Sequence, residues 1–318
     1  MNKINVVFMG TPSFAITTLK KLYEDDDINL SLIVTKKDQR SDRGKKIKFS
    51  DIKNEAINYN IDILTPDNIS KDDNAIKKIK ELEPDFIVVV AYGQILSKEI
   101  IGIPKKAIIN GHASLLPKYR GASPMQAALL NGDKETGITT MFIEEKLDAG
   151  DILEQKKVNI EKKETLETLS DKLSIETANL IIHTIKNFDN IERKKQKEDE
   201  VSFCKIIKKE DGEINFTEDK EVIERKIRAY HFWPTSYINI DNVILKILDV
   251  DFLNDTENKN VNELLLNNML KKISNNILYN NKNMYIKCNN GFLKINKLKP
   301  SGKKEMLAKD YINGLNNK

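Results

Sequence analysis

The chain has 318 residues, of which 40% are hydrophobic and 31% charged, and its net charge at neutral pH is +4. This length exceeds what one core usually holds, so we expect two domains. No apolar run approaches the roughly 20 residues that span a bilayer, and the first residues lack the apolar core of a signal peptide. Only Cys204 and Cys288 occur. Their distance in sequence indicates a protein of the reducing cytoplasm, with neither a disulfide framework nor a zinc site.

The first part of the chain alternates between strand and helix patterns. Apolar runs typical of buried strands lie at 4–9, 30–35, 61–64 and 86–91. Helical spacing lies at 12–23, 51–59 and 72–82, and Thr11 is the expected N-cap of the first helix. Because Gly10 is the only glycine in the first turn, the G-x-G-x-x-G pattern of dinucleotide binding is missing. The alternation predicts an α/β fold with a doubly wound, mostly parallel sheet and a site at the strand carboxyl ends.

Polar side chains then interrupt an apolar strand. The run Ile108-Ile109-Asn110-Gly111-His112-Ala113-Ser114-Leu115-Leu116-Pro117 brings an amide, an imidazole and a hydroxyl into one loop. Taken alone, such residues most often satisfy backbone groups. The next residues lead into a helix with Ser123 as N-cap and Pro124 in its first turn, then a strand at 136–141 and a glycine-containing loop at 146–151.

Four ordered motifs over residues 110–153 are more specific: N-x-H-x-S-L-L-P, K-Y-R-G-A-S-P-x-Q, G-D-K-E-T-G and L-D-x-G-D-I-L. Together they resemble the 10-formyltetrahydrofolate-dependent formyltransferases. The resemblance implies that Asn110, His112 and Asp148 are catalytic. Asn110 and His112 would donate to the oxyanion of formyl transfer. Asp148 would orient His112 and, through a water, relay the proton that the attacking amine loses.

The same resemblance implies a folate site. The cosubstrate 10-formyltetrahydrofolate would lie along Ser114, Leu115, Leu116 and Pro117, with its pterin near Leu147 and its formyl carbon toward Asn110. No metal or redox cofactor is implied. Gly111 departs from the family, which usually has an aliphatic residue there, and we expect this change to loosen the backbone by about 0.5 to 1 kcal/mol.

Basic residues gather in two stretches. Residues 36–53 include eight basic and three acidic residues. Residues 271–318 include eleven lysines and two acidic residues, a net charge of +9. Such patches suggest a polyanionic partner, although a solvated lysine-rich surface is the alternative. Arg43, Lys45 and Lys46 resemble the R-G-K-K loop of family members that bind tRNA, which usually carries prolines and a glycine where this chain has Lys37, Arg40 and Asp42. The resemblance implies initiator methionyl-tRNA as acceptor substrate, and therefore a one-carbon transferase of translation initiation.

The second part of the chain has a different pattern. A helix is expected at 165–185, and the charged run 193–200 is the best linker candidate. A helix at 220–230 and short apolar segments between Asn-rich turns then predict a small β-barrel. The resemblance implies that this barrel is OB-like and helps to hold tRNA, with Lys303 and Lys304 among the contacts. We therefore expect a folate-binding catalytic domain at 1–189, a linker at 190–207 and a tRNA-binding barrel domain at 208–318.

Two other functions remain open. The chain could be another folate-dependent enzyme, such as a sugar-nucleotide formyltransferase or a formyltetrahydrofolate hydrolase domain; the R-G-K-K loop, Gln126 and the basic tail argue against this. It could also be a non-catalytic RNA-binding protein on the same scaffold, against which the intact Asn110, His112 and Asp148 argue. No obligatory protein partner is implied.

Overall fold

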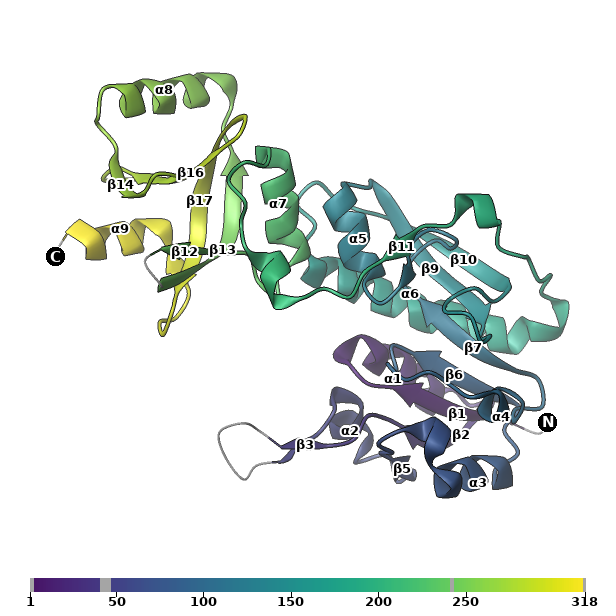
Figure 1. Ribbon diagram of the computed structural model, residues 1–318. Coiled ribbons are helices and arrows are strands. Elements are labelled where there is room, and N and C mark those ends of the chain that lie inside the picture. The colour runs from purple at the N-terminus through teal and green to yellow at the C-terminus, as the bar shows by residue number, and fades with distance from the viewer. Residues whose placement is uncertain (1–2, 41–46, 241–242, 317–318) are drawn as a thin grey trace. The chain divides into compact units, whose positions relative to one another are not determined.

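The computed structural model describes residues 3–40, 47–240 and 243–316, which form two compact units (Figure 1). Unit 1 comprises Met1–Pro124, Glu135–Asn159 and Leu169–Lys205, and unit 2 comprises Met125–Lys134, Ile160–Thr168 and Ile206–Lys318. The chain passes between the two units at several points, the last of them after Lys205. Among the described helices, none has the length and apolar character that crossing a membrane requires.

The described α-helices and β-strands from Ile4 to Cys204 are, in chain order, β1 (Ile4–Gly10), α1 (Ile16–Glu24), β2 (Ile28–Val34), β3 (Gln39–Arg40), β4 (Ile47–Lys48), α2 (Asp51–Ala56), β5 (Ile63–Leu64), α3 (Asp73–Glu81), β6 (Phe86–Val90), α4 (Lys98–Ile101), β7 (Ala107–His112), β8 (Arg120–Gly121), α5 (Pro124–Asn131), β9 (Glu135–Phe142), β10 (Ile152–Asn159), α6 (Leu166–Asn187) and β11 (Phe203–Cys204). The central sheet of unit 1 has the order β10-β9-β7-β6-β1-β2-β5. Its strands from β5 to β7 are parallel, and β9 and β10 add an antiparallel edge. The predicted doubly wound, mostly parallel sheet is confirmed.

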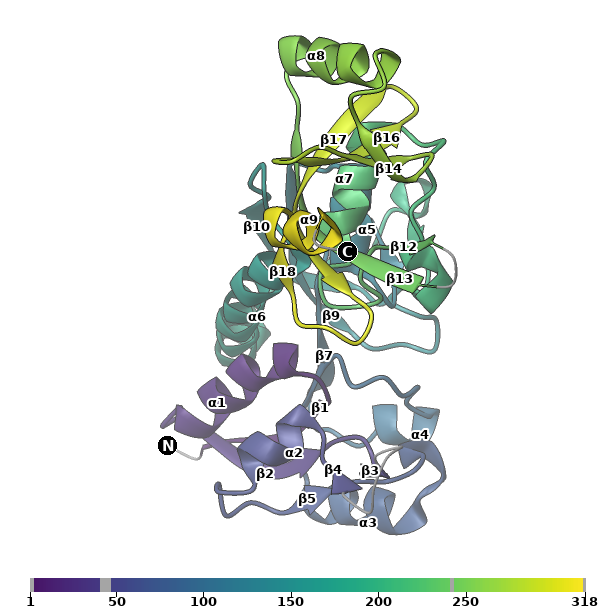
Figure 2. The same cartoon turned by 90° about the vertical axis from the view of Figure 1, so that its left-hand side faces the viewer.

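Helices cover both faces of this sheet. Val7 and Met9 of β1 belong to a buried cluster with α3 and α4 on one face. The other face is covered by α1 and α6, which lie together in Figure 2, where the hydroxyls of Thr17 and Ser174 are 3.2 Å apart. Because alternate strand residues point to opposite faces, a strand buried on both sides needs a continuous apolar run, and β6 is such a strand.

The start of the first helix differs from the prediction. Thr11 is not an N-cap, because its hydroxyl donates to the carbonyl oxygen of Tyr92, in the loop after β6, at 2.8 Å. A short 3₁₀ turn, Ser13–Ala15, precedes α1 instead. A tertiary hydrogen bond has therefore replaced the local one that the sequence suggested.

Unit 2 contains an antiparallel sheet of the barrel type. Its elements are α7 (Lys220–Ala229), β12 (Tyr237–Ile240), β13 (Val243–Phe252), α8 (Asp255–Leu266), β14 (Lys271–Ser274), β15 (Ile277–Tyr279), β16 (Met284–Cys288), β17 (Gly291–Pro300), β18 (Met306–Leu307) and α9 (Ala308–Asn316). The strand order is β12-β13-β17-β16-β15-β14, with β18 also paired to β17. Apolar residues of α7, α9 and these strands form its main core. The predicted small β domain is confirmed, and over the described residues it is a curled sheet with β12 and β14 at its two edges.

Candidate active site

Strand β7 brings the amide and the imidazole to the carboxyl edge of the sheet in unit 1. Asn110 is in register with Val89 of β6, and His112 lies two residues beyond, past the last pair of these strands. Since alternate residues share a face, both side chains point to the same side of β7. The chain runs from β1 to β2 on one side and returns to β6 on the other, so the topological switch point lies between β1 and β6, and β7 is the neighbour of β6 on its other side. Open α/β sheets bind ligands at this edge.

The structure brings His112 and Asp148 together. Nδ1 of His112 is 3.7 Å from Oδ2 of Asp148, and the side chains are only 7% and 12% exposed. Nε2 of the same ring lies 2.9 Å from the carbonyl oxygen of Tyr119. A carbonyl oxygen can only accept, so Nε2 carries a proton and donates it to this bond. The remaining ring nitrogen, Nδ1, is the one that faces the carboxylate.

The loop that carries Asp148 is held in an unusual conformation. Asp148 has a φ of 49°, in the left-handed region that Asp tolerates better than most residues. Its Oδ2 accepts a hydrogen bond of 2.8 Å from the backbone N–H of Gly121. At Gly150 a Cβ would lie 2.0 Å from the carbonyl oxygen of Phe142, so only glycine allows the loop to close against β9. Backbone geometry and one side-chain hydrogen bond together direct the carboxylate toward His112.

Two residues that the sequence did not single out support this loop. Gln196 is buried, and its Nε2 donates to the carbonyl oxygens of Asp148 and Gly150, both at 2.8 Å. Its Oε1 accepts from Nε of Arg120, which is also buried, at 2.9 Å. The sequence carries a signal for the inward position of Gln196, the only uncharged residue of the run from Arg193 to Glu200, but none for its partners.

Two of the five residues expected to contact folate are buried inside unit 1. Ser114 is fully buried, and its hydroxyl donates to the carbonyl oxygen of Lys118 at 2.6 Å. Leu116 packs with Met141 and Ile152 in a small buried cluster. Leu115 and Pro117 are half-buried, and the expected fifth contact, Leu147, is 63% exposed. The carbonyl oxygens of residues 114–117 also accept hydrogen bonds from within unit 1, so Leu115, Pro117 and Leu147 are the parts of this site with exposed surface.

Gly111 does not leave a hole in the structure. A Cβ built on this residue would lie 2.7 Å from Cγ2 of Thr177 and 3.0 Å from Cδ1 of Ile181, both fully buried residues of α6. The volume that an aliphatic side chain would occupy is therefore filled from the helix. The loosening expected from the sequence is offset by this close approach of α6 to β7.

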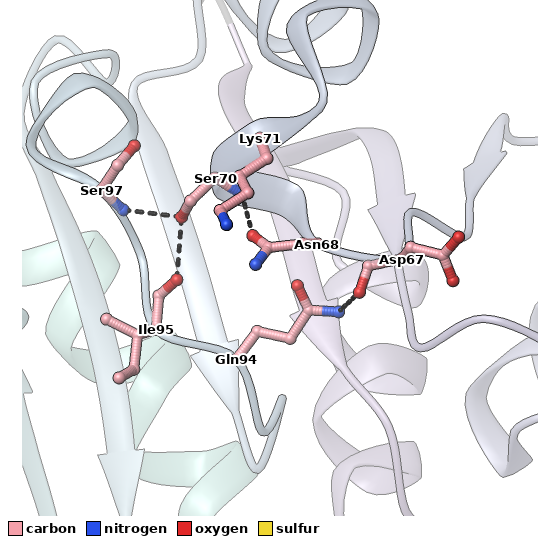
Figure 3. A pocket seen from close by; sticks show the side chains of 7 residues that line it. All are labelled: Asp67, Asn68, Ser70, Lys71, Gln94, Ile95 and Ser97. Carbon is pink, nitrogen blue, oxygen red and sulfur yellow. Dashed lines mark hydrogen bonds between the residues drawn. The ribbon is translucent and has the colours of Figure 1, made fainter.

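A hollow of about 400 Å³ lies beside the loops that follow β5 and β6, and Figure 3 shows the side chains that line it. Its polar groups bond one another. The Ser70 hydroxyl donates to the carbonyl oxygen of Ile95 and accepts from the N–H of Ser97, while Gln94 accepts from the N–H of Ile69. These contacts hold the loop after β6, the strand next to β7, in a defined position.

The basic residues expected to bind tRNA lie in both units. Arg43, Lys45 and Lys46 lie outside the described residues, and the stem that flanks them is the antiparallel pair β3–β4. In unit 2, Lys303 and Lys304 are exposed on the turn between β17 and β18, where Gly302 has a φ of 74°. Within the described ranges, no group of three or more His, Cys, Asp or Glu side chains is arranged to hold a metal ion.

Comparison with known proteins agrees with this architecture. Residues 2–185 match the family described as formyl transferase, and residues 206–316 match the formyl transferase C-terminal domain. The chain is 41% identical to a methionyl-tRNA formyltransferase of Thermodesulfovibrio yellowstonii over 97% of its own length and 95% of that protein's. It is 43% identical to that of Campylobacter lari over 98% and 96% of the two lengths.

Solved structures show the same fold at lower identity. An N-formyltransferase of Helicobacter canadensis, crystallised with folinic acid and dTDP-3-aminofucose, gives a TM-score of 0.64 at 20% identity and covers 96% of this chain and all of its own. The methionyl-tRNA formyltransferase of Clostridium thermocellum gives 0.55 at 20% identity, over 79% of this chain and 95% of its own.

Fold, site and family matches together define a formyl transferase catalytic domain followed by its characteristic C-terminal domain. The two relatives that are 41 and 43% identical over nearly the whole length are both methionyl-tRNA formyltransferases, and they identify the family within this class. The chain belongs to the methionyl-tRNA formyltransferase family, which confirms the resemblance that the four motifs indicated.

Proposed function

We propose that this protein transfers the formyl group of 10-formyltetrahydrofolate to the amino group of methionine on initiator methionyl-tRNA, in the cytoplasm. The observation that supports the mechanism most directly is the approach of His112 to Asp148, 3.7 Å between Nδ1 and Oδ2, at the end of the strand that carries Asn110. The full-length similarity to methionyl-tRNA formyltransferases supports the acceptor. The folinic acid bound to the Helicobacter canadensis relative supports a folate donor.

The reaction needs donors where negative charge develops. The amine attacks the formyl carbon, the formyl oxygen becomes an oxyanion, and the C–N bond to the folate then breaks as that nitrogen is protonated. Each well-placed donor to the oxyanion contributes on the order of 3 kcal/mol. The amide of Asn110 is half-buried at the strand end and suits this role. A protonated Nδ1 of His112 is the second donor, since Nε2 is occupied by Tyr119.

Asp148 orients the ring. Its carboxylate faces Nδ1, the nitrogen proposed to donate to the oxyanion. The gap of 3.7 Å is longer than a hydrogen bond, so the Nδ1 proton is not locked to the carboxylate. The same carboxylate accepts, through a water, the proton that the attacking amine loses, and that proton then reaches the leaving folate nitrogen.

The proposed substrate contacts rest on the family membership. The folate lies along residues 114–117, with the half-buried Pro117 and the exposed Leu147 as apolar walls for the pterin. Arg43, Lys45 and Lys46 contact the acceptor end of the tRNA, and Lys303 and Lys304 contact phosphates through the C-terminal domain. No metal takes part in this scheme.

The decisive assay is formyl transfer to charged initiator tRNA, run beside elongator tRNA and amino sugars. Alanine at Asn110, His112 or Asp148 should each lower kcat by roughly 100-fold or more and leave folate binding largely intact. His183→Ala is the matched control, because the side chain of this histidine is 60% exposed and, among the described residues, contacts only Glu154 through its ring nitrogen. Near-normal turnover in His112→Ala would refute the mechanism, and transfer to amino sugars alone would refute the acceptor.

A further inference from the structure

The segment 194–204, called the strap here, is bonded to both loops of the site. At one end, Lys194 and Ile152 exchange two backbone hydrogen bonds of 2.8 and 2.9 Å. At the other end, β11 runs parallel to β8, and the N–H of Arg120 donates to the carbonyl oxygen of Ser202 at 2.9 Å. The strap therefore joins the chain that follows His112 to the chain that follows Asp148, all within unit 1.

The strap also contacts the backbone groups that fix the two catalytic side chains. The Ser202 hydroxyl accepts from the N–H of Tyr119, whose carbonyl oxygen accepts from His112. On the other side, Gln196 donates to the carbonyl oxygens of Asp148 and Gly150.

Gln196 is the central contact of the strap. One side-chain amide satisfies two carbonyl oxygens of the 148–150 loop, and its own oxygen is held by Nε of Arg120. Gly121, the residue after Arg120, donates its backbone N–H to the carboxylate of Asp148. Gln196 thus joins the two segments that place the carboxylate next to His112, namely the 148–150 loop and the chain at Arg120. Asp148 needs such support because its φ of 49° is unfavourable for a non-glycine residue.

We propose that Gln196 is a positioning residue: its amide, oriented by Arg120, holds the Asp148 loop so that the carboxylate faces Nδ1 of His112. This inference rests on the proposed function, in which that pair acts on the formyl group. Gln196 touches no reactant in this scheme and acts through the backbone of the loop alone. A misplacement of about 1 Å in a catalytic group can lower a rate by roughly 100-fold.

Two substitutions separate hydrogen bonding from packing and charge. Gln196→Met keeps the length and volume of the side chain and removes every hydrogen bond. Gln196→Glu keeps a partner for Arg120 and removes both donors to the loop. Lys194→Ala is the control, since this exposed residue bonds the loop through its backbone only.

Both Gln196 variants should lower kcat by about 10- to 100-fold, while KM for folate and for tRNA changes by less than about threefold. In an Asp148→Ala background, Gln196→Met should add less than about a twofold loss, because its effect requires the carboxylate. Lys194→Ala should match the wild type. Retained activity in Gln196→Met or Gln196→Glu, or a full additional loss in the Asp148→Ala background, would overturn the proposal.

A second measurement does not depend on activity. If the loop is released, the amide of Gly121 loses its carboxylate acceptor, and its hydrogen exchange should become at least about 10-fold faster in Gln196→Met. Unchanged exchange would overturn the positioning role even if activity fell. Absence of formyl transfer in the wild type would instead refute the proposed function, and the exchange of Gly121 would still show whether Gln196 holds Asp148.

Discussion

The close packing at Gly111 leads to a quantitative prediction for Gly111→Ala. In an open site this change would stabilise the protein by about 0.5 to 1 kcal/mol, because alanine has less freedom in the unfolded chain. Here the new Cβ would lie 2.7 Å from Cγ2 of Thr177, deep between α6 and β7. Overpacking of this kind costs about 1 to 3 kcal/mol. We therefore expect Gly111→Ala to lower the free energy of unfolding by about 1 to 2 kcal/mol.

A second substitution should relieve this strain. Thr177→Ser removes the clashing methyl group and keeps the hydroxyl that donates to the carbonyl oxygen of Leu173 at 2.7 Å. Alone it costs about 1 kcal/mol for a buried methyl group. In the double variant the Cβ at position 111 takes the place of that methyl group, and the Cδ1 atom of Ile181 can move because it ends a flexible side chain. The coupling free energy between the two changes should be about 1 to 2 kcal/mol.

Native-state hydrogen exchange of amides in β6 and β7 measures the free energy of unfolding of unit 1 by itself. Global unfolding of a chain with two units does not isolate this quantity. Gly102→Ala is a control in the same unit, because its φ is −85° and a Cβ there meets only ordinary contacts at 3.6 Å. It should be neutral or slightly stabilising. Protection in Gly111→Ala equal to that of the wild type, or additive losses in the double variant, would show that α6 does not fill the site.

Other predictions concern stability, RNA contacts and thiol chemistry. Tyr92→Phe should leave stability unchanged or raise it by up to about 1 to 2 kcal/mol in denaturant unfolding, because the buried hydroxyl has no hydrogen-bond partner among the described residues. Arg43→Ala should weaken transfer to methionyl-tRNA far more than folate binding; equal effects would remove its loop from the tRNA site. Lys303→Gln with Lys304→Gln should flatten the dependence of log tRNA affinity on log salt by about one to two units, and an unchanged slope would exclude these contacts. Burial raises the pKa of the Cys204 thiol, so alkylation by iodoacetamide at pH 8 should be slow, and rapid labelling would show that the strap opens.

Elements with a strong local pattern could be predicted from the sequence. The predicted helix at 165–185 is α6, Leu166–Asn187, and the predicted strand at 86–91 is β6, Phe86–Val90. Burial follows the apolar spacing in α6 and is continuous in β6, as the apolar run there predicts, so local preference and tertiary packing agree. The motif around Asn110 and His112 likewise indicated a strand ending in a polar loop, and β7 ends at His112.

Contacts that depend on distant partners could not be predicted from the sequence. Helix α8 is a different case: it was not predicted, although the capping box of Asn254 and Glu257 is a local signal of its start. No local signal shows that Gln196 bonds the loop of Asp148, because 48 residues separate them and only the folded strap brings them together. The charged run around Gln196 is typical of a linker, yet the strap follows the surface of unit 1 and places one uncharged side chain inward.

The structure also divides the polar residues of the proposed active site into two groups. Ser114 belongs to the same N-x-H-x-S pattern as Asn110 and His112, but its hydroxyl donates a hydrogen bond to the carbonyl oxygen of Lys118 inside the loop. The Asp148 carboxylate is shared, since one oxygen accepts from Gly121 and also faces His112. Loss of Ser114 should therefore destabilise the loop, whereas loss of Asn110 should remove a donor to the reactant. A site of this kind is organised by residues whose hydrogen bonds are already satisfied, and its chemistry depends on the few polar groups that remain available to a substrate.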